Sequence, residues 1–211
     1  MFDATSSVKN LIVIIANEMI SLKDELTAID SKLGDGDLGL SMEKGGQALK
    51  QVCKTDYIDN ATFLATAAVA FNRAAPSTMG TLISYGIQEV AKYFKEKQEI
   101  SESDIVLIPR MFFEIISKRG KAKLGDKTIL DALIPYANEL EKTYEATGEL
   151  CIALDKAAES AKMGMEKTKG MVAKIGRAKW LAERNKDYPD GGAVLCSRIA
   201  DCLVRNFSKL S

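Results

Sequence analysis

The segment from Asp30 to Gly39 (the acidic loop) carries the residues best suited to chemistry. It reads DSKLGDGDLG and places three carboxylates, Asp30, Asp35 and Asp37, among three glycines. Carboxylates this close disfavour one another's ionised form unless a cation shares them. Glycines allow the tight turns that aim several oxygens at one point. A hard divalent cation such as Mg²⁺ takes oxygen ligands and often holds phosphates as well, so the pattern indicates nucleotide chemistry.

The acidic loop has two alternative interpretations, a solvated turn and an EF-hand. Asp and Gly are common turn formers, so a solvated loop between two helices has a similar composition. An EF-hand is excluded by spacing, because the twelfth position counted from Asp35 is Gly46 and not the bidentate Glu which that loop requires.

Composition excludes several classes of protein. The 211 residues contain 29 Lys and Arg against 29 Asp and Glu, so there is no basic excess of the kind that binds nucleic acid. The absence of histidine excludes histidine-based catalysis and a phosphohistidine on this chain. Four scattered cysteines are typical of a reduced, cytoplasmic protein. The apolar run Leu11–Ala16 is too short to span a membrane.

The apolar residues recur with a helical period along nearly the whole chain. Leu11, Ile15, Leu22, Leu26 and Ile29, for example, are spaced by three or four residues or multiples of these. No alternating strand pattern, repeat or low-complexity linker interrupts this period, so we predict a single all-α domain over residues 1–211. The helices are predicted at residues 5–28, 42–54, 60–74, 79–97, 103–119, 127–145, 149–169, 176–184 and 191–209.

Glycines and polar residues gather in the connections between the predicted helices. The main segments are Pro76–Thr81, Gly120–Thr128, Gly176–Arg177 and Pro189–Ala193. Most of them open a helix, where free N–H groups and the helix dipole attract phosphate. If alternate connections of an up-and-down bundle gather at one end, these segments surround the acidic loop. The alternative is that the polar residues are ordinary helix N-caps and the glycines ordinary helix breakers.

These segments resemble those of one family, the nucleotide-binding L subunit of bacterial dihydroxyacetone kinases. That family shows a GDGDHG-type loop preceded by Asp, a GG-S-S-G segment, a G-x-K-x-GDKT-x-LDAL segment, a GRA-x-x-L-x-ER-S segment and a DPGA turn. The corresponding residues here are Asp30 with Gly34–Gly39, Pro76–Gly80, Gly120–Leu133, Gly176–Arg184 and Asp190–Ala193. The resemblance implies an antiparallel barrel of about eight amphipathic helices with the nucleotide at one open end.

The resemblance also implies roles for individual residues. Asp30, Asp35 and Asp37 match the ligands of two Mg²⁺ ions that bridge the phosphates of ADP or ATP, and together with Arg177 they form the implied catalytic set. The implied phosphate contacts are Leu38, Ser41, Ser77, Thr78 and Gly80, and the implied nucleoside contacts are Gly125, Thr128, Met171, Arg177, Asp190 and Gly192. In an alternative arrangement, Arg177 contacts the phosphates and not the nucleoside.

The chain departs from the family pattern at two single residues and in the Pro76–Gly80 segment, where Met79 also replaces the second Ser. The family has His where this chain has Leu38, and Asn where it has Ser41. Pro76 and Ser77 replace paired glycines, and Pro76 has no N–H to offer a phosphate. One preorganised donor contributes about 3–4 kcal/mol to transition-state stabilisation. We therefore expect Mg-nucleotide binding to be better preserved than turnover of dihydroxyacetone.

Partners also follow from the resemblance. In the family, a separate K subunit binds the triose covalently through its own histidine. In free-standing systems, a phosphocarrier subunit of the phosphotransferase system recharges a permanently bound ADP, whereas fused kinases use exchangeable ATP. A chain without the K domain resembles the free-standing arrangement. The alternatives are a nucleotide-sensing module that docks a partner such as a transcription regulator, and a plain helical scaffold.

Overall fold

The computed structural model describes residues 4–97, 99–175 and 186–209. Over these residues the chain is helical, and no strand interrupts the helices. The elements are α1 (Ala4–Ser21), α2 (Lys23–Leu33), α3 (Leu38–Val52), α4 (Asn60–Ala74), α5 (Thr78–Lys95), α6 (Glu102–Val106), α7 (Ile108–Gly120), α8 (Leu130–Thr147), α9 (Leu150–Lys167), α10 (Gly191–Arg205) and the 3₁₀ turn η2 (Phe207–Lys209).

Two of the predicted helices are interrupted once. The helix predicted at residues 5–28 is α1 and α2, which meet at Leu22 and extend to Leu33. The helix predicted at residues 103–119 is α6 and α7, which meet at Leu107 just before Pro109 in the first turn of α7. Leu22 and Leu107 both keep right-handed helical dihedral angles. Counting each pair as one helical rod gives eight rods among the described residues, in agreement with the about eight helices that the family resemblance implies.

Other boundaries differ by a few residues. The helix predicted from residue 42 begins at Leu38, and the one predicted from residue 127 begins at Leu130. Lys127 has a φ of +61°, which a right-handed helix does not allow. The helix predicted at residues 176–184 lies outside the described residues.

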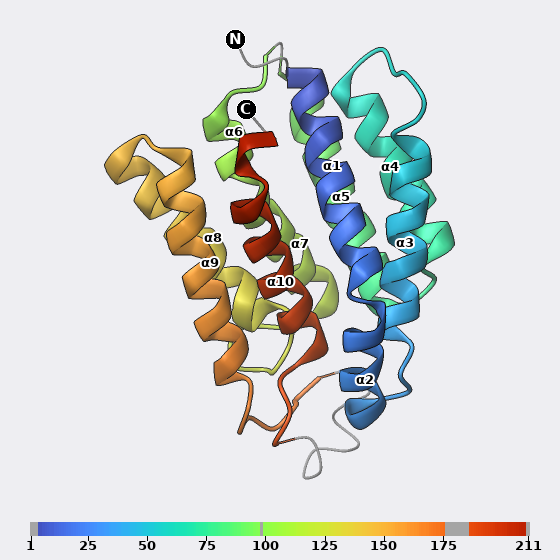
Figure 1. Ribbon diagram of the computed structural model, residues 1–211, viewed down its shortest axis with the longest axis vertical. Coiled ribbons are helices and arrows are strands. Elements are labelled where there is room, and N and C mark those ends of the chain that lie inside the picture. The colour runs from blue at the N-terminus through green and yellow to red at the C-terminus, as the bar shows by residue number, and fades with distance from the viewer. Residues whose placement is uncertain (1–3, 98, 176–185, 210–211) are drawn as a thin grey trace.

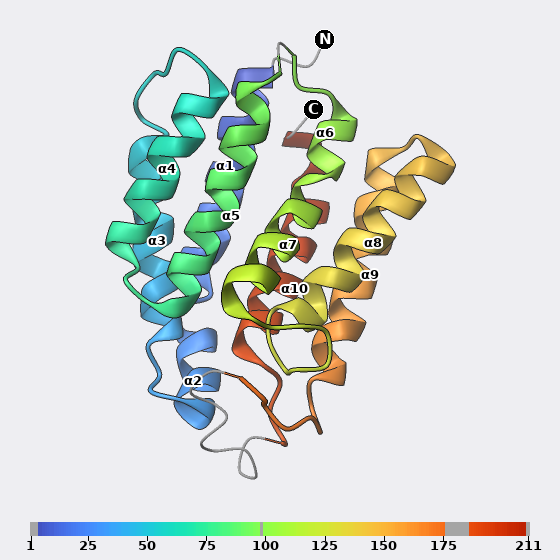
Figure 2. The same cartoon turned by 180° about the vertical axis from the view of Figure 1, so that it is seen from behind.

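The eight rods close into a ring (Figures 1 and 2). Contacts run from α1 to α3, α4, α5, α7, α8, α9 and α10 in that order, and α10 returns to α1. Successive rods run up and down, so every second connection falls at the same end of the ring. This arrangement confirms the predicted antiparallel barrel.

Apolar side chains from all around the ring fill its interior. Phe63 and Phe71 of α4, Leu26 of α2, Met42 of α3 and Leu195 of α10 are almost completely buried. Near the axis a cavity of about 220 Å³ is lined almost entirely by apolar side chains of α1, α5, α7, α8, α9 and α10. The interior therefore holds the rods together by apolar burial, and the polar chemistry is left to the connections.

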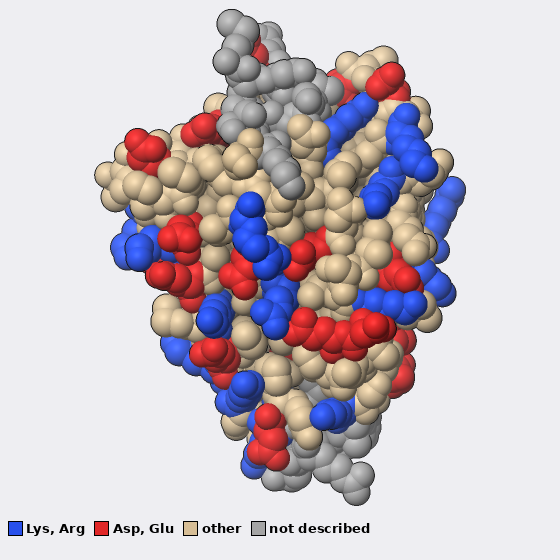
Figure 3. Space-filling model, viewed as in Figure 1, with Lys and Arg blue, Asp and Glu red and all other residues tan. Residues whose placement is uncertain are grey.

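Ion pairs cross the seam where the ring closes. Arg198 of α10 lies 2.8 Å from Glu25 of α2, and Arg205 of α10 lies 3.3 Å from Glu18 of α1. On this face acidic and basic side chains are interspersed (Figure 3). Among the described helices, none is both long and apolar enough to cross a membrane.

Candidate functional site

The acidic loop joins α2 to α3 at one end of the barrel. Asp30 lies in the last turn of α2, Asp35 in the turn itself, and Asp37 directly before α3. Gly36 has a φ of +77°, and a Cβ there would lie 2.6 Å from the Ser31 hydroxyl. A side chain at this position would therefore be strained and crowded, so glycine is needed to bring the carboxylates together.

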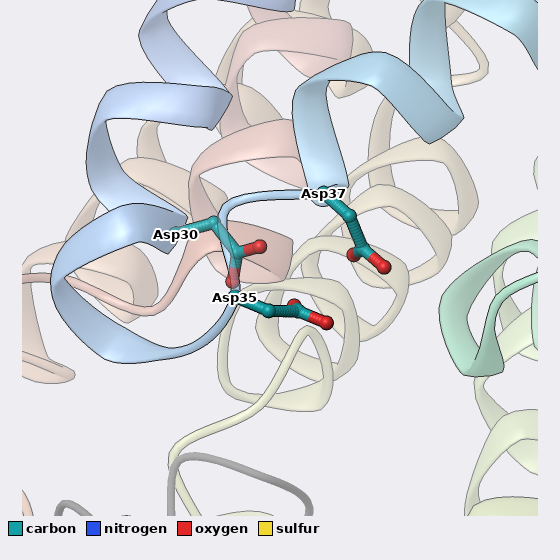
Figure 4. A group of neighbouring side chains, drawn as sticks. All are labelled: Asp30, Asp35 and Asp37. Atoms are coloured by element: carbon teal, nitrogen blue, oxygen red, sulfur yellow. The ribbon is translucent and has the colours of Figure 1, made fainter.

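The three carboxylates converge on one point (Figure 4). Each offers one oxygen atom, and these oxygens all lie within 4.8 Å of one another. Asp35 is exposed, whereas Asp30 and Asp37 are half-buried. Burial raises the pKa of Asp37 above its usual value, and the charge of Asp30 raises it further. Three hard oxygen donors that disfavour one another's charge fit a divalent cation such as Mg²⁺.

The neighbouring backbone holds one of these carboxylates in place. The Leu38 N–H donates to Asp30 Oδ2 at 3.1 Å, which links the last turn of α2 to the first turn of α3. The N–H of Gly34 donates to the Asp30 carbonyl at 2.6 Å. Asp30 is therefore oriented by the loop that it helps to form.

The other predicted loop segments that the structure describes, which are Pro76–Thr81, Gly120–Thr128 and Pro189–Ala193, lie at the same end of the barrel (Figures 1 and 2). These are the α4–α5, α7–α8 and α9–α10 connections. Three of the connections meet at the N-terminus of α10. A Cβ at Gly191 would lie 2.7 Å from Leu38, and one at Gly192 would lie 2.7 Å from Met79 and 3.0 Å from Ile129. The structure thus brings together the segments that the sequence placed far apart.

Two predicted phosphate-contacting residues in α3 point to the interior. Leu38 is 8% exposed and packs with the apolar core, against Gly191. Ser41 is 9% exposed, one turn further along α3. The apolar side chain at position 38 therefore has a packing role here, at a place where the family pattern has a histidine.

The α4–α5 connection ends in a helix N-cap. Ser77 precedes α5, and its Oγ accepts the Gly80 N–H at 3.1 Å. Thr78 is exposed, and Gly80 is buried against Ala75. Ser77 has the capping role that the sequence left open, while Thr78 faces solvent at the same helix terminus.

The α7–α8 connection is organised by a carboxylate that sequence reasoning missed. Asp131, which is 3% exposed, accepts the Gly125 N–H at 2.6 Å and the Thr128 N–H at 2.8 Å. Asp126 and Lys127 beside them are also buried. All of these lie in the GDKT-x-LDAL stretch. The sequence shows that polar residues are concentrated there, but it does not show that they are buried.

The α9–α10 connection contains three of the predicted residues. Met171 is half-buried, and its carbonyl accepts a bond from Lys127 Nζ at 3.1 Å. Asp190 caps α10 by accepting the Ala193 N–H at 2.8 Å, and its own N–H donates to Thr168 Oγ1 at 2.9 Å. The predicted residue Arg177 lies outside the described residues.

Burial raises the pKa of the Asp190 carboxyl to about 7, and the charge of Asp131 adds to this effect. The folded protein therefore binds this proton more tightly than the unfolded chain, and stability falls as pH rises from about 4 to about 7. We expect Asp190→Asn, which stays neutral and still caps the helix, to become more stable relative to wild type by about 2 kcal/mol between pH 5 and pH 8.

Urea unfolding at the two pH values, with EDTA present, measures this change. The chain has no histidine, so few other side chains titrate in this window. A difference between Asp190→Asn and wild type that stays constant with pH would contradict the prediction.

Known proteins are similar to this chain in sequence and in fold. The DAK2 domain family matches residues 32–205. An L-erythrulose kinase of Pectobacterium atrosepticum is 33% identical over 183 residues, which cover 85% of this chain and 31% of that protein. The human triokinase/FMN cyclase is 28% identical over 192 residues, covering 90% of this chain and 33% of that protein.

A solved structure with the same fold is the dihydroxyacetone kinase of C. freundii in complex with AMP-PNP and Mg²⁺. It aligns with a TM-score of 0.73 at 19% identity, over 98% of this chain and 34% of the other. The chain thus spans about a third of the length of these relatives. Because the family match extends from the acidic loop to the last turn of α10, the chain belongs to the DAK2-domain family.

Proposed function

We propose that this chain is the Mg-nucleotide-binding unit of a kinase that phosphorylates a triose or a related keto-sugar. The observation that carries the proposal is the convergence of Asp30, Asp35 and Asp37 at the end of the barrel where the other described family segments also meet. The relatives named as kinases support the reaction class. In this proposal residues 1–211 act as one nucleotide-binding domain.

The three carboxylates would hold two Mg²⁺ ions together with the phosphates of ADP or ATP. When bound, such ions neutralise charge on the transferred phosphoryl group. The role of the chain is to hold the three carboxylates in one orientation through Gly36 and the Leu38 N–H. The complex of the C. freundii kinase with AMP-PNP and Mg²⁺ supports this choice of ligand.

Residues of the neighbouring connections would complete the nucleotide site. Thr78 and the N–H groups that open α5 are suited to a phosphate, because Thr78 is exposed at that helix N-terminus. Gly125, Thr128 and Met171 are proposed to face the nucleoside. Asp190 and Gly192 would act beside them, and Arg177 would contact either the nucleoside or the phosphates.

The sugar would be held outside this chain. These 211 residues match about a third of the length of each relative, and the proposal concerns this third alone. We propose that a K-type subunit presents the sugar and that an M-type phosphocarrier recharges bound ADP. We also propose that the protein is cytoplasmic.

A second candidate is a nucleotide-sensing module that docks a protein partner. The observation that favours it is Leu38, which is buried in the core where the family pattern places a histidine donor. Retention of the three carboxylates is consistent with both candidates. Phosphoryl transfer to dihydroxyacetone in the presence of a K-type subunit separates them, because only the kinase unit supports it.

Thermal unfolding tests whether the protein binds ADP or ATP together with Mg²⁺. We expect Mg²⁺ with ADP, at about 100 times the dissociation constant, to add about 2.7 kcal/mol of stability. For a chain of this size the midpoint rises by roughly 5–11 °C. Bound nucleotide is first removed by unfolding and refolding in EDTA, and each nucleotide is tested with Mg²⁺ and with EDTA. An unchanged midpoint with both ADP and ATP would contradict the proposed function.

A further inference from the structure

Lys127 connects three chain segments at the end of the barrel that carries the acidic loop. Its side chain is buried, and its Nζ donates to the carbonyl oxygens of Met171 at 3.1 Å and Tyr188 at 2.9 Å. These carbonyls are 44 and 61 residues away along the chain. One ammonium group in the α7–α8 connection therefore bonds to both described parts of the α9–α10 connection.

The position of Lys127 is unfavourable in two respects. Its backbone φ of +61° is one that residues with side chains rarely adopt. Burial disfavours the ammonium charge and lowers the pKa of Lys127, an effect that Asp190 and Asp187 partly oppose. Its bonds to the two carbonyls compensate for these costs, because a buried charge is tolerated when hydrogen bonds satisfy it.

Further hydrogen bonds surround these contacts. Lys174 donates its N–H to the Asp126 carbonyl at 3.2 Å and its Nζ to the Gly125 carbonyl at 2.8 Å. The Gly170 N–H donates to the Lys186 carbonyl at 2.6 Å. We call residues 123–128, 168–174 and 186–190 the loop junction. Lys127 bonds across all three of its segments.

The loop junction also contacts the acidic loop. Lys32 Nζ lies 4.4 Å from the centroid of the Tyr188 ring, a cation–π contact. Lys32 is two residues beyond Asp30, in the last turn of α2. The carbonyl of Tyr188 accepts a hydrogen bond from Lys127, and its ring contacts Lys32. Tyr188 therefore connects the acidic loop to the loop junction.

We propose that Lys127 is a positioning residue of the nucleotide site. Its ammonium group fixes the segments around Met171 and Asp190 against each other. Through Tyr188 it also sets their distance from the three carboxylates of the acidic loop. Lys127 acts through these carbonyls and needs no contact with the nucleotide. The inference rests on the proposed function for its ligand, but the rigidity of the loop junction can be measured without any ligand.

The test compares Lys127→Met with Lys121→Met. Methionine keeps an unbranched apolar stem and removes the donors. Lys121 is a matched control, because it lies in the same connection with a φ of +51° but is exposed. Lys127→Arg, which keeps the charge and the donors, is the conservative variant.

Two readouts are expected to change together. Amide hydrogen exchange at Gly170, Lys174 and Asp190, whose N–H groups bond within the loop junction, should be about tenfold faster or more in Lys127→Met. The dissociation constant of MgADP should rise by about tenfold or more, as for residues that orient metal-site ligands. Lys121→Met should match wild type in both, and Lys127→Arg should recover part of the loss.

Wild-type exchange rates and MgADP affinity in folded Lys127→Met would overturn the inference. So would a lowered unfolding midpoint with unchanged exchange rates and affinity in the folded state, because Lys127 would then have a structural role alone. If wild type itself does not bind MgADP, the proposed function fails. The exchange rates of Lys127→Met and Lys121→Met then still decide whether Lys127 fixes the loop junction.

Discussion

Asp35→Asn is expected to lower the affinity for MgADP by about 100-fold or more while the unliganded protein stays folded. Asparagine keeps the shape of the side chain but removes one of three converging charges. Residues that only orient metal ligands already contribute 10–100-fold, so loss of a proposed ligand should exceed this. Isothermal titration of MgADP into the EDTA-treated protein measures the affinity.

The behaviour of the unliganded protein distinguishes a ligand from a structural residue. Asp35 is exposed, so its substitution should change the free energy of unfolding by no more than about 0.5 kcal/mol. Loss of one charge also relieves repulsion within the acidic loop. Asp155→Asn, at an exposed position on α9, is the control and should bind MgADP as wild type does. Wild-type affinity in Asp35→Asn would refute the metal assignment.

Asp131→Ala is expected to have the largest effect on stability. Its carboxylate accepts two backbone N–H groups, from Gly125 and Thr128, in a buried position. A hydrogen bond to a charged group contributes about 1.5–3 kcal/mol, so we expect a loss of about 3 kcal/mol. For this chain length the unfolding midpoint should fall by roughly 6–12 °C, as measured by calorimetry.

Two further variants define the origin of this loss. Asp131→Asn keeps one acceptor oxygen and should fall between wild type and Asp131→Ala. Glu145→Ala removes an exposed carboxylate from the same helix and should stay within about 0.5 kcal/mol of wild type. If Asp131→Ala were as stable as Glu145→Ala, the α7–α8 connection would not depend on this carboxylate.

The parts of the site that were predictable are those determined by near neighbours. Asp30, Asp35 and Asp37 lie within eight residues, so any tight turn that the glycines permit brings them together. The helices follow from periodicity in the same way. The roles assigned to the individual site residues remain predictions.

The loop junction was not predictable, because its contacts join distant residues. No local pattern indicates that Lys127 is buried or that its partners lie 44 and 61 residues away. Lysine is also an unusual residue at a positive φ. The helix interruption at Leu22 was also not predictable, because there is no glycine or proline at that position. At position 38, comparison with the family pattern indicates that a histidine donor is missing. Only the fold shows that Leu38 packs against Gly191 instead.

The closed ring also permits a different order of its rods along the chain. The contact between α1 and α10 makes the first and last rods neighbours like any other pair. The start of α1 and the end of α10 lie together at the end of the barrel away from the acidic loop (Figure 1). A short linker between them, with a new opening in the α3–α4 connection at the same end, would give a circular permutant. All four site-bearing connections would remain intact in it.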